Sequence, residues 1–134
     1  MIWTFKIELF YGEWEATIEI DATSTLEDLH FIMQEAVGFD NDHLYEFYIS
    51  RTERSRDRVR FDDDNEGVFT ATVESLYPLA RRKCLYYMFD YGDSWLFKIT
   101  KTRKGPKEAR TDREYPRVVN EGGKKPEQYR AWEE

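Results

Sequence analysis

The stretch Phe89-Asp90-Tyr91-Gly92-Asp93-Ser94-Trp95 lies between two aromatic-rich runs, residues 84–88 and 96–100. Such runs on either side of a turn predict a β-hairpin. Gly92-Asp93 is typical of a tight two-residue loop, because glycine adopts a positive φ at the first central position without steric cost. The sequence therefore places the turn of this hairpin at Gly92.

The loop length predicts which residues share a face of the hairpin. A two-residue loop pairs Asp90 with Trp95 and Met88 with Phe97. One face then carries a single carboxylate among apolar side chains, namely Tyr86, Met88, Asp90, Trp95, Phe97 and Ile99. A buried carboxylate must be paired, hydrogen-bonded or protonated, so Asp90 is the polar residue of greatest interest.

A second hairpin is predicted at the start of the chain, from strands at residues 2–10 and 14–20. Apolar and polar residues alternate in both strands, as expected for a sheet with one buried face. A loop at Tyr11-Gly12 pairs Trp3 with Ile20, Phe5 with Ile18, Ile7 with Ala16 and Leu9 with Trp14. This register places all the apolar residues on one face.

A helix is predicted over residues 24–37. Ser24 and Glu27 have the spacing of a capping box, and Gly38 is suited to end the helix in a left-handed conformation. Leu26, Leu29, Met33 and Val37 recur at helical spacing.

The remaining elements complete an α+β fold with a ββαβ opening. We expect strands at 43–49 and 58–61 and an extended segment at 115–119. Between them, either a strand at 68–73 or a short helix near 72–77 is possible, and we favour the helix. The prediction is one domain, 1–134, with a mainly antiparallel sheet of five to seven strands, one principal helix and a less regular tail at 104–134.

Composition limits the classes of function. A formal net charge of −7 over 134 residues argues against generic polyanion binding. The single cysteine, Cys84, allows no internal disulfide and fits a reducing compartment. No leader-like segment opens the chain and no apolar run could span a bilayer, so we expect a cytoplasmic protein without a membrane anchor.

Three words in the sequence, taken in order, carry a resemblance: 26–30 (Leu-Glu-Asp-Leu-His), 43–47 (His-Leu-Tyr-Glu-Phe) and 89–95. Together with Tyr115-Pro116-Arg117 they resemble the plasmid Ri (pRiA-type) ORF-three-like family. That family includes insertion-element passenger proteins with a resolvase-like (TnpR-like) label. The resemblance covers roughly residues 2–127 and implies a fold more than an activity.

The chain departs from the family pattern near its end. Members often carry a cysteine just after the Tyr-Pro-Arg word and a second one later, where this chain has Val118 and a shortened 125–128 segment. A metal or redox role for that cysteine pair is therefore not implied here. The resemblance leads us to expect an accessory protein of mobile elements, and no recombinase constellation is visible.

Asp90, Asp93 and His43 are the candidates for chemistry. Paired carboxylates and a histidine are the residue types of an acid–base or metal site. The competing interpretation is that Asp93 caps the turn and Asp90 satisfies a buried donor, and turn propensities favour it. A zinc site needs three or four nitrogen or sulfur ligands, and His30, His43 and Cys84 are the only candidates, so we expect no metal and no cofactor.

The segment Arg51–Arg60 is the candidate for nucleic-acid binding. Alternate spacing at Arg54, Arg56, Arg58 and Arg60 would place four guanidinium groups on one face of a strand. The alternative is a charged edge strand neutralised by the aspartates that follow. The net charge of −7 favours the second interpretation.

The outer face of the Gly92 hairpin is the candidate interaction surface. The predicted register places Tyr87 and Tyr91 on the face opposite Trp95, and that face needs its own cover. We therefore favour a non-enzymatic binding or accessory module over an enzyme. The predicted binding residues, for a protein partner, are Tyr87, Tyr91, Asp90, Asp93, Trp95 and His43.

Overall fold

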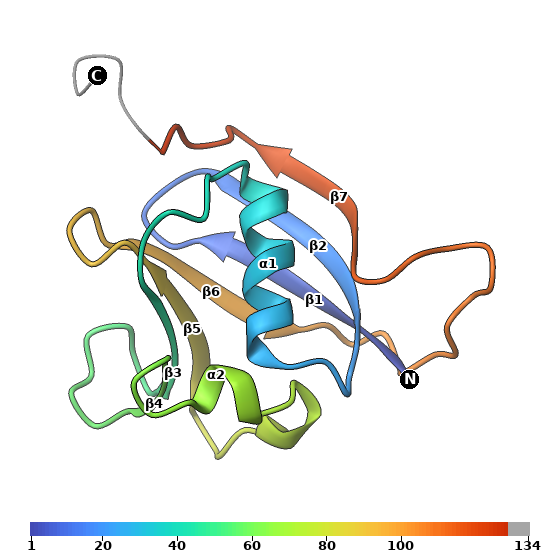
Figure 1. The fold of residues 1–134 in the computed structure, drawn as a ribbon, viewed down its shortest axis with the longest axis horizontal. Coiled ribbons are helices and arrows are strands. Elements are labelled where there is room, and N and C mark those ends of the chain that lie inside the picture. The colour runs from blue at the N-terminus through green and yellow to red at the C-terminus, as the bar shows by residue number, and fades with distance from the viewer. Residues whose placement is uncertain (129–134) are drawn as a thin grey trace.

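The computed structural model describes residues 1–128 and contains one antiparallel sheet of seven strands. The strands are β1 (Ile2–Leu9), β2 (Trp14–Asp21), β3 (Tyr45–Ser50), β4 (Val59–Phe61), β5 (Cys84–Phe89), β6 (Trp95–Lys101) and β7 (Arg117–Gly123). They lie in the order β4-β3-β5-β6-β1-β2-β7. Helix α1 (Leu26–Val37) crosses one face of this sheet (Figure 1). The predicted α+β fold with five to seven strands, one principal helix and a ββαβ opening is confirmed.

The register of the first hairpin is the predicted one. Trp3 pairs with Ile20, Phe5 with Ile18 and Ile7 with Ala16. All the paired apolar residues face α1 and, except Trp3, are almost wholly buried. The alternation of apolar and polar residues explains why the predicted register is correct, because a shift of one residue would expose all of these apolar side chains to solvent.

Helix α1 begins one residue later than predicted. Thr25, not Ser24, is the N-cap, and Asp28 completes the capping box. The carbonyl of Ser24 accepts a hydrogen bond from Val73 N, which ties this position to a distant segment. Gly38 ends the helix with φ 78°, as predicted.

The segment between β4 and β5 contains two single-turn helices. They are α2 (Gly67–Thr70) and the 3₁₀ helix η1 (Glu74–Leu76). The helix predicted near 72–77 is therefore present only as η1. The extended segments predicted at 58–61 and 115–119 correspond to β4 and β7, whose ends differ from the predicted ones. No helix within residues 1–128 is long and apolar enough to cross a membrane.

The predicted register of the β5–β6 hairpin is wrong by one residue. Phe89 pairs with Trp95 and Tyr87 with Phe97, so five residues, 90–94, connect the strands. Asp90 and Ser94 take the left-handed conformation, with φ 64° and 55°, and Ser94 N donates to Asp90 O at 2.6 Å. The left-handed residues are Asp90 and Ser94 rather than Gly92. The loop is therefore five residues long, and not the two residues predicted from Gly92-Asp93.

This slip exchanges the two faces of β5. Tyr87 and Phe89 lie in the core under α1, together with Trp95, while Tyr86 and Met88 lie on the opposite face. The prediction that Tyr87 lies on an outer surface is therefore wrong, because its side chain is fully buried.

The outer face of the sheet has a small aromatic cluster of its own, formed by Tyr48, Tyr86 and Leu96. The chain between β3 and β4 covers it. Tyr48 donates its hydroxyl to Glu53 O at 2.9 Å, and the Arg58 guanidinium lies 4.0 Å from the centre of the Tyr48 ring. Residues of the 51–58 segment therefore cover part of the second face.

Candidate functional site

Asp90 is the residue that shapes the β5–β6 turn. The residue is 8% exposed, and its Oδ1 atom accepts hydrogen bonds from Gly92 N at 3.1 Å and Asp93 N at 3.4 Å. Its own amide donates to Leu44 O at 2.9 Å. The predicted buried carboxylate is therefore satisfied by backbone amides of its own turn, in the manner of an Asx cap.

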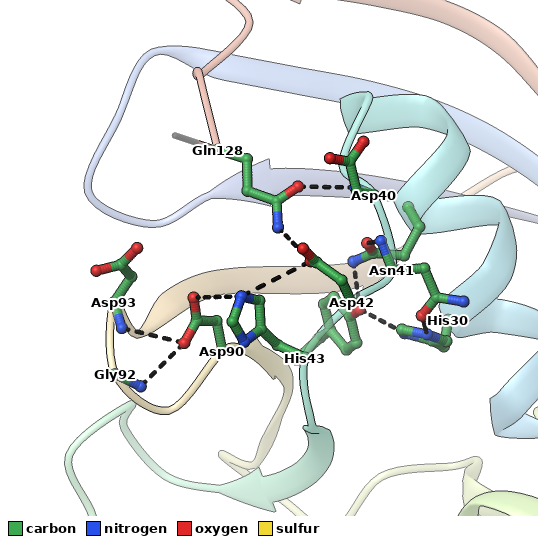
Figure 2. A network of polar contacts seen from close by, with 11 residues as sticks. His30, Asp40, Asn41, Asp42, His43, Asp90, Gly92, Asp93 and Gln128 are labelled. Atoms are coloured by element: carbon green, nitrogen blue, oxygen red, sulfur yellow. Dashed lines mark hydrogen bonds and ion pairs between the residues drawn. The ribbon is translucent and has the colours of Figure 1, made fainter. Parts of the chain in front are cut away.

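His43 lies beside this carboxylate. Its Nε2 atom is 3.5 Å from Asp90 Oδ2 and 3.7 Å from Asp42 Oδ1. The Asp93 carboxylate turns away from this pair (Figure 2). Of the three predicted site residues, the structure brings His43 and Asp90 together and leaves out the side chain of Asp93.

Gln128 connects this pair to the end of the described chain. Its side-chain amide donates to Asp42 Oδ1 at 2.7 Å and accepts from Asp40 N at 2.7 Å (Figure 2). Gln128 is 8% exposed. The loop that holds His43 is thereby fastened to the segment after β7, a contact that the sequence pattern did not indicate.

The histidine–carboxylate pair has no hydroxyl nucleophile in the turn beside it. Ser94, the hydroxyl residue of the same turn, donates its Oγ to Tyr91 O at 3.2 Å. Among residues 1–128 no group of three or more His, Cys, Asp and Glu side chains is arranged to hold a metal ion. The observed contacts position the loop around His43 and the turn around Asp90.

A closed ring of hydrogen bonds lies behind this site. Gln34 Nε2 donates to the Tyr87 hydroxyl oxygen at 2.9 Å, and that hydroxyl lies 2.5 Å from His30 Nδ1. His30 Nε2 is 2.6 Å from Asn41 Oδ1, and Asn41 N donates to Gln34 Oε1 at 3.0 Å. Asn41 Oδ1 can only accept, so His30 carries its proton on Nε2 and accepts from Tyr87 at Nδ1.

Burial keeps His30 neutral. Burial lowers the pKa of His30 from 6.5 to about 4, against a smaller opposite effect of its bond to Asn41. The His30 ring also stacks on Tyr45, with centroids 3.5 Å apart. From the sequence alone, His30 was considered only as a possible metal ligand. The hydrogen-bond ring could have been predicted if Tyr87 had been placed on the face of β5 that packs against the helix. The predicted register placed Tyr87 on the other face.

A hollow lies over Trp95 at the end of the sheet. Leu9, Tyr11 and Trp95 give it apolar walls, and Asp93, Ser94 and Gln128 give it polar ones, around a volume of about 250 Å³. Trp95 is half-buried and packs on Phe39, with ring centroids 5.1 Å apart. Its indole Nε1 is buried with no hydrogen-bond partner among the described residues.

Tyr91 and Tyr11 are the exposed aromatic side chains at this end of the sheet, with exposed fractions of 47% and 67%. Tyr91 belongs to the β5–β6 turn, and Tyr11 to the β1–β2 turn beside it (Figure 1). Burial of its ring and the nearby carboxylates of Glu46 and Asp62 raise the pKa of Tyr91 to about 12. Tyr91 therefore remains a candidate surface residue, whereas Tyr87 does not.

The arginine segment does not form the predicted strand face. Only residues 59–61 are a strand. Arg54 pairs with Glu53, Arg60 pairs with Glu46, and Arg58 donates to the carbonyls of Ser55 and Glu53. These contacts occupy most of the cationic side chains that were candidates for phosphate binding.

The sequence as a whole matches a known family. The model of the family described as plasmid pRiA4b ORF-3-like protein matches residues 3–129. The chain belongs to this family. The resemblance carried by the Asp90–Trp95 word is thereby confirmed, and residues 89–95 form the turn described above.

The similar proteins described below bear on the fold of this chain and give no activity for it. A protein of Sinorhizobium fredii (strain NBRC 101917 / NGR234), described as uncharacterized protein y4hQ, is 30% identical over 112 residues. The match covers 78% of this chain and 49% of the relative, so the chain spans about half the length of that curated relative. The crystal structure of a protein of unknown function, MM3350 from Methanosarcina mazei Go1, is similar with a TM-score of 0.72 at 20% identity. That likeness covers 91% of this chain and 68% of the other, and it shows a shared fold.

Proposed function

We propose that this chain is a non-enzymatic binding module that holds a basic segment of a partner protein at the β5–β6 turn. The observation that carries the proposal is the hollow over Trp95, which Tyr11 and Trp95 line, together with the exposed Tyr91 in the adjoining β5–β6 turn. Exposed aromatic side chains beside a hollow are characteristic of recognition surfaces.

The charge around the hollow indicates the chemistry of the partner. Asp93 lines the hollow, and a neighbouring hollow of about 480 Å³ shares Tyr11 and Trp95 and is bordered by Glu13 and Glu127. Lys124 and Lys125 also border it, and Lys125 pairs with Glu121 at 3.6 Å. With a net charge of −7 on the chain, carboxylates beside aromatic faces favour an arginine- or lysine-bearing segment.

The role of Asp90 in this proposal is structural. Its carboxylate fixes the loop that presents Tyr91 and Asp93, and His43 braces it from the neighbouring loop. The plasmid description of the family supports the further part of the proposal, an accessory role in mobile elements. The site needs no cofactor for this function.

Selection from a displayed random-peptide library against the purified chain tests the proposal. We expect basic peptides to be enriched and a synthetic copy of the best peptide to lose at least tenfold in affinity on Tyr91→Ser or Tyr11→Ser. Phe69→Ser is the matched control, because Phe69 has the same exposed fraction as Tyr91, 47%, and lies in α2. No enrichment, enrichment of acidic peptides, or an equal loss in the control variant would contradict the proposal.

A further inference from the structure

Another hollow lies beside the first residue of β5, at the end of this strand that is opposite to the β5–β6 turn. It has a volume of about 290 Å³. Lys83, Lys98 and Lys101 line it, together with Tyr77, Leu79 and Thr100. We call it the basic hollow, because its three charged lining residues are all lysines.

Glu8 lies opposite Lys98 in the register of β1 and β6, but no short ion pair holds these lysines in the described part of the chain. Within residues 1–128, none of the three has a carboxylate within 4.0 Å, although Lys6, Lys107 and Lys125 elsewhere each do. Lys101 instead lies over the ring of Trp3, at 4.2 Å from its centroid. Like charges that share a hollow repel one another, and a bound anion would relieve that repulsion.

The basic hollow continues into two flanking segments of the same charge. Residues 81–83 read Arg-Arg-Lys, and residues 98–104 read Lys-Ile-Thr-Lys-Thr-Arg-Lys, without one acidic residue in either. Leu85 pairs with Ile99, and the same register continued outward places residue 83 beside residue 101. The exposed Arg81, Arg82, Arg103 and Lys104 also lack a carboxylate partner among the described residues.

The lining of the basic hollow offers more than charge. Leu79 and Ile99 supply an apolar surface, and Thr100 supplies a hydroxyl. The hydroxyl of Tyr77 is buried and has no hydrogen-bond partner among the described residues. A planar ring with a phosphate group would match an apolar surface bordered by lysines.

We propose that the basic hollow and its flanking arginines bind single-stranded nucleic acid. One base enters the hollow, and the phosphates on either side contact the lysines and the exposed arginines. The cations number seven and come from two adjacent segments, residues 81–83 and 98–104, which suits a chain of phosphates better than a single phosphate group. A membrane surface fits less well, because neither flanking segment has an exposed large apolar side chain.

The proposal differs from phosphate binding by residues 51–60, whose arginines are held by carboxylates and carbonyls. It is also independent of the peptide site at the β5–β6 turn, which lies at the other end of the same hairpin. Each of the two proposals can therefore fail without the other.

Fluorescence anisotropy with a fluorescein-labelled 12-mer of oligothymidylate tests the proposal. With about four phosphates contacted, affinity should fall roughly 50-fold between 50 and 200 mM salt. The double variant Arg81→Glu/Lys83→Glu should weaken binding at least tenfold at 50 mM salt. The matched control Arg54→Glu/Arg56→Glu reverses two exposed charges of the 51–60 segment and should stay within twofold.

Circular dichroism confirms that both double variants fold. Inorganic phosphate and a fluorescein-labelled duplex of the same length serve as competing probes, and we expect both to bind more weakly than the single strand. The proposal is overturned by absence of binding at 50 mM salt, by equal losses in the two double variants, or by equal affinity for inorganic phosphate or duplex.

Discussion

Protonation of His30 should destabilise the fold in a defined pH window. The neutral ring accepts a hydrogen bond from the Tyr87 hydroxyl and donates one to Asn41 Oδ1. A second ring proton would point a donor at Tyr87, whose oxygen already accepts from Gln34. The Tyr87 hydroxyl proton would then lose its acceptor inside the core.

The pKa of His30 sets the size and sign of the effect. Because it falls from 6.5 to about 4 on folding, the folded protein binds fewer protons than the unfolded chain between these values. Stability therefore drops as the pH falls through this window. Linkage gives a loss of about 2 kcal/mol between pH 7 and pH 5, and of roughly 3 kcal/mol once the pH is below both values.

Urea denaturation at pH 7 and pH 5, followed by tryptophan fluorescence, measures this loss. The difference in unfolding free energy between the parent chain and His30→Gln should shrink by about 2 kcal/mol from pH 7 to pH 5. In a His43→Gln background His30 is the only histidine, so NMR can follow its ring alone. A ring that titrates near pH 6.5, or a free-energy difference that stays constant, would refute the reasoning.

Substitutions at two further residues, Asp90 and Glu19, test the polar contacts that fix the fold. Asp90→Asn keeps an acceptor oxygen and tolerates a positive φ, so the unfolding free energy should change by less than about 1 kcal/mol. Asp90→Ala removes the acceptor and should lower the unfolding free energy by about 1–3 kcal/mol. Equal losses of the two variants in urea denaturation would show that the charge, and not the acceptor oxygen, holds the turn. Burial alone would raise the pKa of Glu19, but its contacts with Lys107 and Arg117 outweigh this effect and lower it. Glu19→Gln should therefore lower the unfolding free energy by about 1–3 kcal/mol at pH 7, because it removes the buried partner of two cations. This loss should shrink as the pH falls from 4.5 through the lowered pKa of Glu19, while the exposed control Glu15→Gln changes little at either pH.

Alternation of apolar and polar residues predicted part of the fold from the sequence alone. In β1 and β2 only one face is apolar, so a single register buries it, and the predicted pairs of Trp3, Phe5 and Ile7 are the observed ones. The end of α1 at Gly38 was equally predictable, because a left-handed cap favours glycine. The N-cap of the helix was misplaced by one residue, since Ser24 and Thr25 both precede an acidic residue by three positions.

The register of the β5–β6 hairpin was determined by the tertiary structure. Residues 85–89 are Leu-Tyr-Tyr-Met-Phe, apolar on both faces, so alternation could not fix their register. The turn length follows from Asp90 in a left-handed conformation, with its amide bonded to Leu44 O. That bond joins distant parts of the chain, and the register it sets buries Tyr87 beside His30 and leaves Tyr91 exposed. The sequence identified Asp90 as the residue to explain, and only the folded chain determined that it shapes a turn.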